Sequence, residues 1–194
     1  MAGAKQKPPG RIRIVGGSRR GHRLKVPREG SVRPTSERVR EALFDILGPV
    51  DGLTVLDLFA GSGALGLEAL SRGAAHCTFV EADNGVARTL GENIDTLGLS
   101  DRSEVLVMPY ARALARLGFR GEAYHLLFVD PPYTMLPEVE LALRPALPAL
   151  LRPGGVIVIE GPPTLELDAG LEVVFRRRYG STVVTIVKEG AGRR

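Results

Sequence analysis

Short apolar runs alternate with segments of helical periodicity through most of the chain, and this rhythm constrains the fold more than any other feature. Apolar runs joined by helical segments are typical of βαβ units, in which helices cover both faces of a parallel sheet. Two further strand-like runs flank Gly180-Ser181 and predict a closing hairpin at the sheet edge. We therefore expect an α/β fold with strands at 53–59, 75–81, 104–108, 125–129, 156–160, 171–178 and 182–187, and with helices near 64–72, 83–97, 110–117 and 137–151.

Positive charge is concentrated in the first forty residues. This segment holds twelve lysines and arginines against two acidic residues, a net charge of +10, while the whole chain carries +4 and residues 41–194 therefore carry −6. A basic segment on a mildly acidic body is the expected footprint of an appendage that binds nucleic acid. A solvated tail that only aids solubility is the alternative. The candidate contacts are Arg11, Arg13, Arg19, Arg20, Arg23 and Arg38.

The same segment leads into the predicted body of the protein. We expect a disordered basic tail at 1–10 and a β-hairpin at 11–26, which turns at Gly16-Gly17 and presents arginines on its outer side. Thr35 is the expected N-cap of a helix that has Glu37 in its first turn and ends at Gly48-Pro49. The predicted organisation is a tail at 1–10, an extension at 11–35 and one domain at 36–190.

Composition excludes several classes of protein. No apolar run approaches the length of a membrane span, and the N-terminus lacks the apolar stretch of a secretory signal. The single cysteine, Cys77, excludes an internal disulfide and a cysteine-cluster zinc site. The three histidines are scattered without metal-ligand spacing, so we expect no metal. Together these observations predict a cytoplasmic protein.

A glycine-rich segment follows the first predicted strand of the body. Gly61 and Gly63 let the backbone turn tightly beside a ligand, and Gly66 lets the following helix pack near the strand. This spacing alone is shared by dinucleotide and S-adenosylmethionine sites, and a tight turn without a ligand is a further alternative. Asp57 lies inside the strand, where its carboxylate suits a ligand with a positively charged amino group; capping of the helix or loop is the alternative.

The next predicted strand ends in an acid. Glu81 lies twenty residues after Gly61, the spacing of a carboxylate that accepts hydrogen bonds from a ribose diol. Both nicotinamide cofactors and S-adenosylmethionine contain such a ribose, so Glu81 does not distinguish them. We expect Asp83 to cap the following helix.

The segment Asp130-Pro131-Pro132-Tyr133 stands at the carboxyl end of a predicted strand, where open α/β sheets bind ligands. Asp130 and the Pro131 carbonyl together accept the two N–H bonds of an amino group attached to a ring. This arrangement frees the nitrogen lone pair, and Asp130 stabilises the positive charge that develops on nitrogen during methylation. The Tyr133 ring suits stacking on a flat base. A proline-rich loop with an incidental tyrosine is the alternative.

These motifs, together with the segments 11–23, 33–44 and 57–74, resemble the RsmD-type bacterial 16S ribosomal RNA guanine-N2 methyltransferases from about residue 11 to residue 188. The 33–44 stretch is the most specific part of the resemblance. It implies a class I S-adenosylmethionine-dependent methyltransferase fold, Rossmann-like, with a seven-stranded sheet whose last strand is antiparallel. It implies methylation of one guanine N2 of 16S RNA within the small ribosomal subunit or an assembly intermediate.

The resemblance also implies roles for individual residues. Asp130, Pro131, Pro132 and Tyr133 would hold the flipped guanine, and Arg33 and Thr35 would lie near the active site and contact RNA. The family's Asp-Ala pair, which reaches the adenine, is replaced here by Met108-Pro109-Tyr110-Ala111, so that Tyr110 stacking or backbone contact takes over. The expected cofactor contacts are Asp57, Phe59, Ala60, Gly61, Ser62, Gly63, Glu81, Ala82, Tyr110 and Ala111.

Other functions remain open at this point. The tetrapeptide also suits methylation of adenine N6 or of a protein amide. A nicotinamide-dependent oxidoreductase leaves Asp57 and the tetrapeptide without a role, and a non-catalytic ribosome assembly factor would keep the fold without the reaction. The run Arg176-Arg177-Arg178 is explained by RNA contact or equally by a charged, soluble sheet edge. We expect a monomer.

Overall fold

The structure, a computed structural model, describes residues 12–27, 36–162 and 171–189. The predicted tail at 1–10 and the candidate contacts Arg11, Arg33 and Thr35 lie outside these residues. Within them, no helix is long and apolar enough to cross a membrane, and no cluster of three metal-binding side chains occurs.

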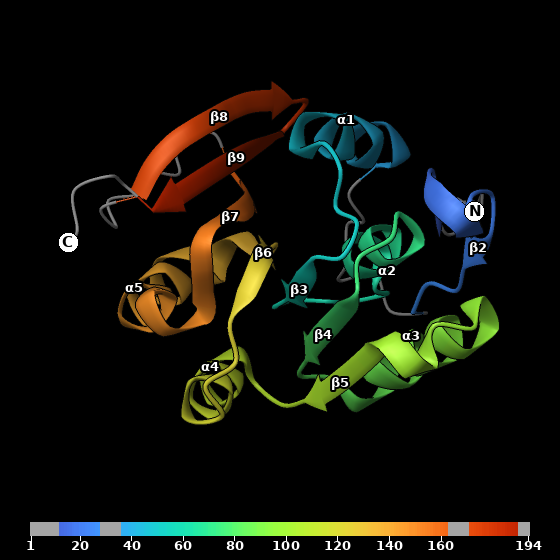
Figure 1. The fold of residues 1–194 in the computed structure, drawn as a ribbon, viewed down its shortest axis with the longest axis horizontal. Helices are drawn as coiled ribbons and strands as arrows, with labels where there is room; N and C mark the ends of the chain where they lie inside the picture. The colour runs from blue at the N-terminus through green and yellow to red at the C-terminus, as the bar shows by residue number, and fades with distance from the viewer. Residues whose placement is uncertain (1–11, 28–35, 163–170, 190–194) are drawn as a thin grey trace, which may run out of the picture.

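The chain order reproduces the predicted alternation of strands and helices (Figure 1). The strands are β1 (Ile12–Arg13), β2 (Arg23–Leu24), β3 (Thr54–Asp57), β4 (His76–Glu81), β5 (Ser103–Val107), β6 (Tyr124–Val129), β7 (Leu151–Gly161), β8 (Leu171–Tyr179) and β9 (Thr182–Glu189). The helices are α1 (Glu37–Leu47), α2 (Ala64–Ser71), α3 (Asn84–Leu97), α4 (Tyr110–Phe119) and α5 (Leu136–Leu150), with short 3-10 turns η1 (Gly17–Arg19), η2 (Ser100–Arg102) and η3 (Tyr133–Met135).

Seven strands form one sheet in the order β5-β4-β3-β6-β7-β9-β8. The first five are parallel, and β9 runs antiparallel to both β7 and β8, which confirms the mostly parallel sheet and the closing hairpin. The chain builds outward from β3 to β5 and then resumes on the other side with β6. The carboxyl ends of β3 and β6 therefore meet at the switch point of the sheet, where ligands bind in open α/β folds.

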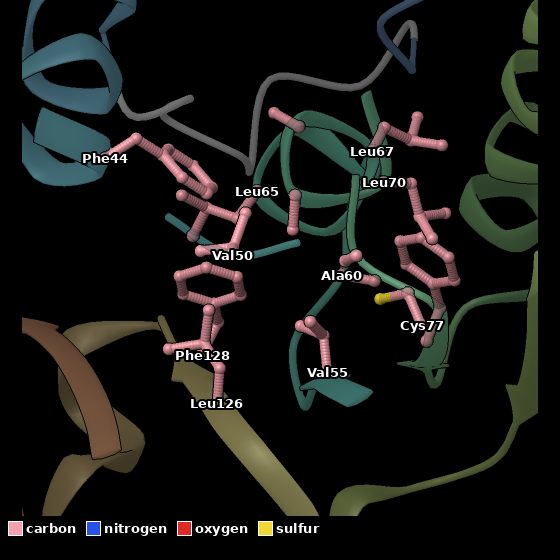
Figure 2. Close-up of a cluster of buried hydrophobic side chains, with 14 of the residues drawn as sticks. Phe44, Val50, Val55, Ala60, Leu65, Leu67, Leu70, Cys77, Leu126 and Phe128 are labelled. Carbon is pink, nitrogen blue, oxygen red and sulfur yellow. The ribbon is translucent and has the colours of Figure 1, made fainter. Parts of the chain in front are cut away.

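Helices bury both faces of the sheet. Side chains of α1, α2 and α3 share one apolar cluster with alternate residues of the strands, and α4 and α5 share a second cluster on the opposite face. Figure 2 shows part of the first cluster, in which Phe44 of α1 points toward Phe128 of β6, with ring centroids 5.9 Å apart. Neighbours along one strand, such as Val55 and Leu56, belong to opposite clusters, as expected for a sheet buried on both sides.

Helix α1 begins one residue later than predicted. The N-cap is Ser36, whose hydroxyl oxygen accepts a hydrogen bond from the Val39 N–H at 3.3 Å, so the assignment of this role to Thr35 is wrong. The two hydroxyl residues are adjacent, and the observed helix places Ser36 in reach of the free N–H. Glu37 in the first turn and the end before Gly48 are confirmed.

The N-terminal strands pair as predicted, but Gly16-Gly17 does not form the turn between them. Strands β1 and β2 are two residues long, and residues 14–22 connect them through η1. Gly17 has φ +74°, and a Cβ there would lie 1.9 Å from the Ser71 carbonyl oxygen. The glycines therefore allow this loop to pack closely on the end of α2. In the sequence, this packing requirement looks the same as a turn signal.

A buried carboxylate fixes the extension on α2. Glu68 is 0% exposed, and its two oxygens accept the N–H groups of Val15 at 2.8 Å and Gly16 at 2.7 Å. Arg72, one turn further along, donates to the same carboxylate at 2.7 Å. The Ser71 hydroxyl adds a hydrogen bond to the Gly16 carbonyl at 2.6 Å. Since every hydrogen bond here is buried or partly buried, losing the acceptor leaves several donors unpaired.

We expect Glu68→Ala to lower the free energy of unfolding by about 3–5 kcal/mol, because it strands the Arg72 guanidinium and two backbone N–H groups. Glu92→Ala is the matched control, since the Glu92–Lys25 ion pair is exposed and such pairs contribute about 0–1 kcal/mol. Urea denaturation of both variants measures the difference. Equal losses in the two variants would contradict this role of Glu68.

Candidate functional site

The glycine loop between β3 and α2 lies at the switch point. The Leu58 N–H donates to the Phe128 carbonyl of β6 at 3.0 Å, and the Ala60 N–H donates to the Val80 carbonyl of β4 at 2.9 Å. These two bonds hold the loop between the ends of its neighbouring strands. The loop is thereby placed beside both the Glu81 end of β4 and the Asp130 end of β6.

Three glycines, two in the loop and one in the first turn of α2, meet conditions that other residues do not. Gly63 has φ +83°, and a Cβ there would lie 2.4 Å from a Leu90 methyl group. A Cβ at Gly66 would lie 2.3 Å from the Phe79 ring, so Gly66 permits close packing of α2 on β4, the neighbour of the strand that precedes the loop. Gly61 has a positive φ of 53°. The tight turn is therefore built into the sequence.

Asp57 supplies the helix cap that Gly63 lacks. Gly63 is the N-cap of α2 and has no side chain, and the Asp57 carboxylate accepts the N–H of Gly66 in the first turn at 3.1 Å. The pKa of Asp57 is raised to about 7, mainly by burial and to a lesser degree by the nearby Glu81 charge, against the opposing hydrogen bonds from Gly66 and Phe59. Asp57 thus caps helix α2, as the alternative interpretation of this residue proposed, and its carboxyl group titrates near neutral pH.

Glu81 links the loop to the start of α3. One carboxylate oxygen accepts the Gly61 N–H at 3.0 Å, and the other accepts the Asp83 N–H at 2.9 Å. The Asp83 carboxylate in turn caps α3 through the N–H groups of Gly85 and Val86 at 2.7 and 2.8 Å, as predicted. Glu81 therefore lies next to the glycine loop, and each of its oxygens keeps a lone pair that can accept another hydrogen bond. Its contact with a ribose stays a prediction.

An aromatic pair joins the glycine loop to the start of α4. Tyr110, the first residue of α4, lies with its ring centroid 5.3 Å from that of Phe59 and tilted by 41°. Both rings are half-buried, and the Met108 N–H donates to the Glu81 carbonyl at 3.0 Å, which fixes the approach to α4 against β4. The residues that replace the family's Asp-Ala pair thus place an aromatic face at the loop. Ala82 and Ala111 are exposed nearby in the chain.

The predicted tetrapeptide directly follows β6. Asp130 is half-buried, Pro131 is buried, and Pro132 and Tyr133 are exposed. The Pro132 carbonyl accepts the Met135 N–H at 2.8 Å, which closes η3 and turns the chain into α5. The Tyr133 hydroxyl lies 2.7 Å from the Thr182 hydroxyl at the start of β9. The segment that carries the predicted chemistry is thus held at the same sheet edge as the glycine loop.

The basic residues of the extension are less uniform than their number suggests. Arg20, Arg23 and Arg38 are exposed. Arg13 pairs with Glu37 at 2.9 Å, and the half-buried Arg19 donates to the Leu97 carbonyl at 2.6 Å. The outer placement of arginines therefore holds for Arg13, Arg20 and Arg23 and is wrong for Arg19, because its guanidinium ties the extension to the end of α3.

Arg40 also serves the fold. It belongs to the basic segment by sequence but is 0% exposed, and its guanidinium donates to the Arg13 carbonyl at 2.6 Å. Burial lowers the pKa of Arg40, and the charges of Glu68 and Glu37 oppose this shift. Part of the positive charge counted in the first forty residues is therefore internal.

Asn93 is a site-supporting residue that the sequence analysis missed. Its side-chain N–H group donates to the Ser62 carbonyl and to the Lys25 carbonyl, both at 3.0 Å, and its oxygen accepts the Lys25 N–H at 2.8 Å. The available signal was a polar residue among Leu90, Ile94 and Leu97 on the buried face of α3. This side chain joins the glycine loop to the extension.

Comparisons with known proteins agree with this geometry. A family model described as "Conserved hypothetical protein 95" matches residues 12–188. A Bacillus subtilis (strain 168) protein named "Putative rRNA methyltransferase YlbH" is 38% identical over 182 residues, covering 92% of this chain and 99% of that protein. "Ribosomal RNA small subunit methyltransferase D" of Escherichia coli (strain K12) is 46% identical over 125 residues, which span 64% of this chain and 61% of that protein.

Solved structures share the fold. One described as "Putative methyltransferase yhhF from Escherichia coli" superposes with a TM-score of 0.80 at 36% identity, covering 93% of this chain and 99% of that one. One described as "Crystal structure of SMU.776, a putative methyltransferase complexed with SAH" superposes with a TM-score of 0.65 at 17% identity, covering 78% of this chain and 48% of that one. The chain therefore belongs to the family that the matching model describes, the RsmD-type family that its motifs resemble, and it has the fold of class I S-adenosylmethionine-dependent methyltransferases.

Proposed function

We propose that this protein transfers a methyl group from S-adenosylmethionine to the exocyclic N2 of a guanine in 16S ribosomal RNA of the small subunit. The observation that carries the proposal is the adjacency of two motifs at the switch point. Asp130-Pro131-Pro132-Tyr133 follows β6, and the glycine loop is bonded to the same strand through Leu58 and Phe128. Family membership supports the reaction class, and the names of the relatives support ribosomal RNA as the substrate.

The residues around the loop fit the three parts of S-adenosylmethionine. The proposed contacts are Asp57 with the amino group, Glu81 with the ribose hydroxyls, and the Phe59–Tyr110 pair with the adenine. The backbone of residues 60–63 approaches the ligand closely because the loop carries glycines at positive φ. When bound, this cofactor supplies an electrophilic methyl group, and S-adenosylhomocysteine is the product.

The tetrapeptide acts on the base. A guanine amino nitrogen is a poor nucleophile, since its lone pair is delocalised into the ring. Asp130 and the Pro131 carbonyl accept its two N–H bonds, and the Tyr133 ring holds the flipped base by stacking. A bond forms between nitrogen and the methyl carbon as the bond from carbon to sulfur breaks. Asp130 stabilises the positive charge that develops on nitrogen, and the acidic product ammonium then releases its proton to water.

The first experiment measures methyl transfer from labelled S-adenosylmethionine to small ribosomal subunits and naked 16S RNA from cells lacking this protein, with nucleoside mass spectrometry. We expect N2-methylguanosine, and a loss of roughly 100-fold or more in rate with Asp130→Ala, the scale of losing a group that stabilises transition-state charge. Asp101→Asn, which changes an exposed acid in η2, is the control and keeps full activity. Methylated adenine or labelled protein in place of N2-methylguanosine would redirect the proposal.

A pH titration separates the two roles of Asp57. Because burial raises the pKa of the free carboxyl group to about 7, a cationic amino group beside it would favour the charged form and release a proton. The affinity for S-adenosylhomocysteine should therefore rise by about tenfold per pH unit below pH 7 and level off above it. Calorimetry between pH 5.5 and pH 7.5 measures this. Asp57→Asn should bind with little pH dependence, and an equally flat profile in the parent protein would leave Asp57 with capping alone.

The aromatic pair generates another prediction. Tyr110→Ala should weaken S-adenosylhomocysteine binding roughly 5- to 100-fold, the range expected for loss of one aromatic ring stacked on a base. Phe119→Ala, at the other end of α4 and 95% exposed, is the matched control and should bind like the parent protein. Unchanged affinity in Tyr110→Ala would assign the adenine contact to the backbone instead.

A further inference from the structure

The tip of the β8–β9 hairpin touches the predicted base-binding tetrapeptide. The Tyr133 hydroxyl is hydrogen-bonded to the Thr182 hydroxyl at 2.7 Å, across 49 residues of sequence. Both residues lie at the carboxyl-end edge of the sheet, since Tyr133 follows β6 and Thr182 opens the antiparallel strand β9. Tyr133 remains 41% exposed in this contact, so its side chain stays accessible to a ligand. The bond therefore limits how the ring turns without covering it.

The strand register places an arginine on the same face of the hairpin. Tyr179 pairs with Thr182, and Arg177 pairs with Val184, so these four side chains project from one side of the two strands. Arg177 is exposed, and its guanidinium carbon lies 5.5 Å from the centre of the Tyr179 ring. A cation is thus held over an aromatic ring beside the residue that contacts Tyr133.

The distribution of charge along β8 does not match simple protection of a sheet edge. Charged side chains along an exposed edge oppose pairing with another strand, and they are needed most where that edge is apolar. Here Val173 and Val174 are 47% and 45% exposed, whereas the arginines 176–178 gather at the end of the strand next to Thr182. The residues that face these arginines in the register are uncharged, so the positive charge of β8 is concentrated at the end of the strand near Thr182, while the apolar end carries the Glu172–Lys188 ion pair.

We propose that the β8–β9 tip is a wall of the RNA site, in which Thr182 orients the Tyr133 ring and Arg177 contacts a phosphate beside the target base. This inference rests on the proposed function, because it takes RNA as the substrate. A base drawn out of its stack brings its own flanking phosphates to the rim of the pocket, where a guanidinium neutralises one of them. Thr182 is a positioning residue, since it acts through Tyr133.

The test of Thr182 is a double-mutant cycle on methyl transfer to small subunits from cells lacking this protein. Thr182→Val and Tyr133→Phe should each lower kcat/KM for RNA roughly 3- to 10-fold, as expected for one hydrogen bond, and the double variant should lose no more than either single one. Thr182→Ser should keep the parent value. The KM for S-adenosylmethionine and the melting temperature should stay unchanged. Additive losses, or a parent-like Thr182→Val, would overturn the positioning role.

The test of Arg177 is the salt dependence of RNA binding. Arg177→Ala should weaken binding roughly 3- to 10-fold and reduce the slope of log affinity against log salt by about 0.7–0.9, the loss of one phosphate contact. Arg116→Ala is the control, because it removes an exposed charge from α4, which lies far from the β8–β9 hairpin in Figure 1. Slopes that match in both variants would overturn the phosphate contact.

These outcomes are distinguishable from failure of the proposed function. If the parent protein modifies guanine N2 and both Thr182→Val and Arg177→Ala match it, only the inference about the hairpin falls. If the parent protein binds cofactor and methylates no RNA, the proposed function and the hairpin inference fall together.

Discussion

Helix α2 connects the glycine loop to the N-terminal extension, and its complete burial makes that connection rigid. All eight residues of the helix are buried, including the charged Glu68. Its first turn is capped by Asp57 beneath the glycine loop, and its last turn holds the extension through Glu68, Ser71 and Arg72. Because a buried charge must keep its partners, the extension cannot shift on the helix without breaking several hydrogen bonds at once. The proposed RNA-docking segment and the proposed cofactor loop are therefore both fixed to helix α2.

Asn93 provides a second path between the same two parts. It mimics a strand neighbour by bonding both backbone groups of Lys25, and it uses the same nitrogen to reach the Ser62 carbonyl in the glycine loop. A helix face that buries Leu90, Ile94 and Leu97 tolerates this amide because its polar atoms are satisfied. The extension is therefore part of the same packed body as the loop, which its buried residues Ile12, Ile14 and Leu24 also show by their place in the shared core.

Sequence reasoning predicted the features that depend on local pattern. The apolar rhythm identified β3 through β9, since a sheet buried on both faces leaves continuous apolar runs. Sequence reasoning failed where contacts between residues far apart in the chain determine the structure. The pair Gly16-Gly17 has the composition of a turn, but glycine is needed at these positions because a Cβ would collide with Arg72 or Ser71. The bonds of Thr182 to Tyr133 and of Asn93 to Lys25 join residues 49 and 68 positions apart, so no local pattern contains them.

The count of charged residues is likewise known from the sequence, but which of these charges are exposed is known only from the structure. The first forty residues carry +10 by sequence, yet Arg40 is enclosed in the core, Arg19 is committed to the end of α3, and Arg13 and Lys25 pair with acids. Within the described part of the extension and α1, the field that RNA would meet comes mainly from Arg20, Arg23 and Arg38. The sequence named the arginines at 176–178 without deciding between RNA contact and a soluble sheet edge, and the structure shows that they are exposed at the end of β8, on the hairpin whose Thr182 contacts Tyr133. Attraction of a phosphate depends on where exposed charges lie and falls off within about 8–10 Å at physiological salt. The topology of the sheet therefore decides where the proposed RNA contacts are possible more than the net charge of any segment does.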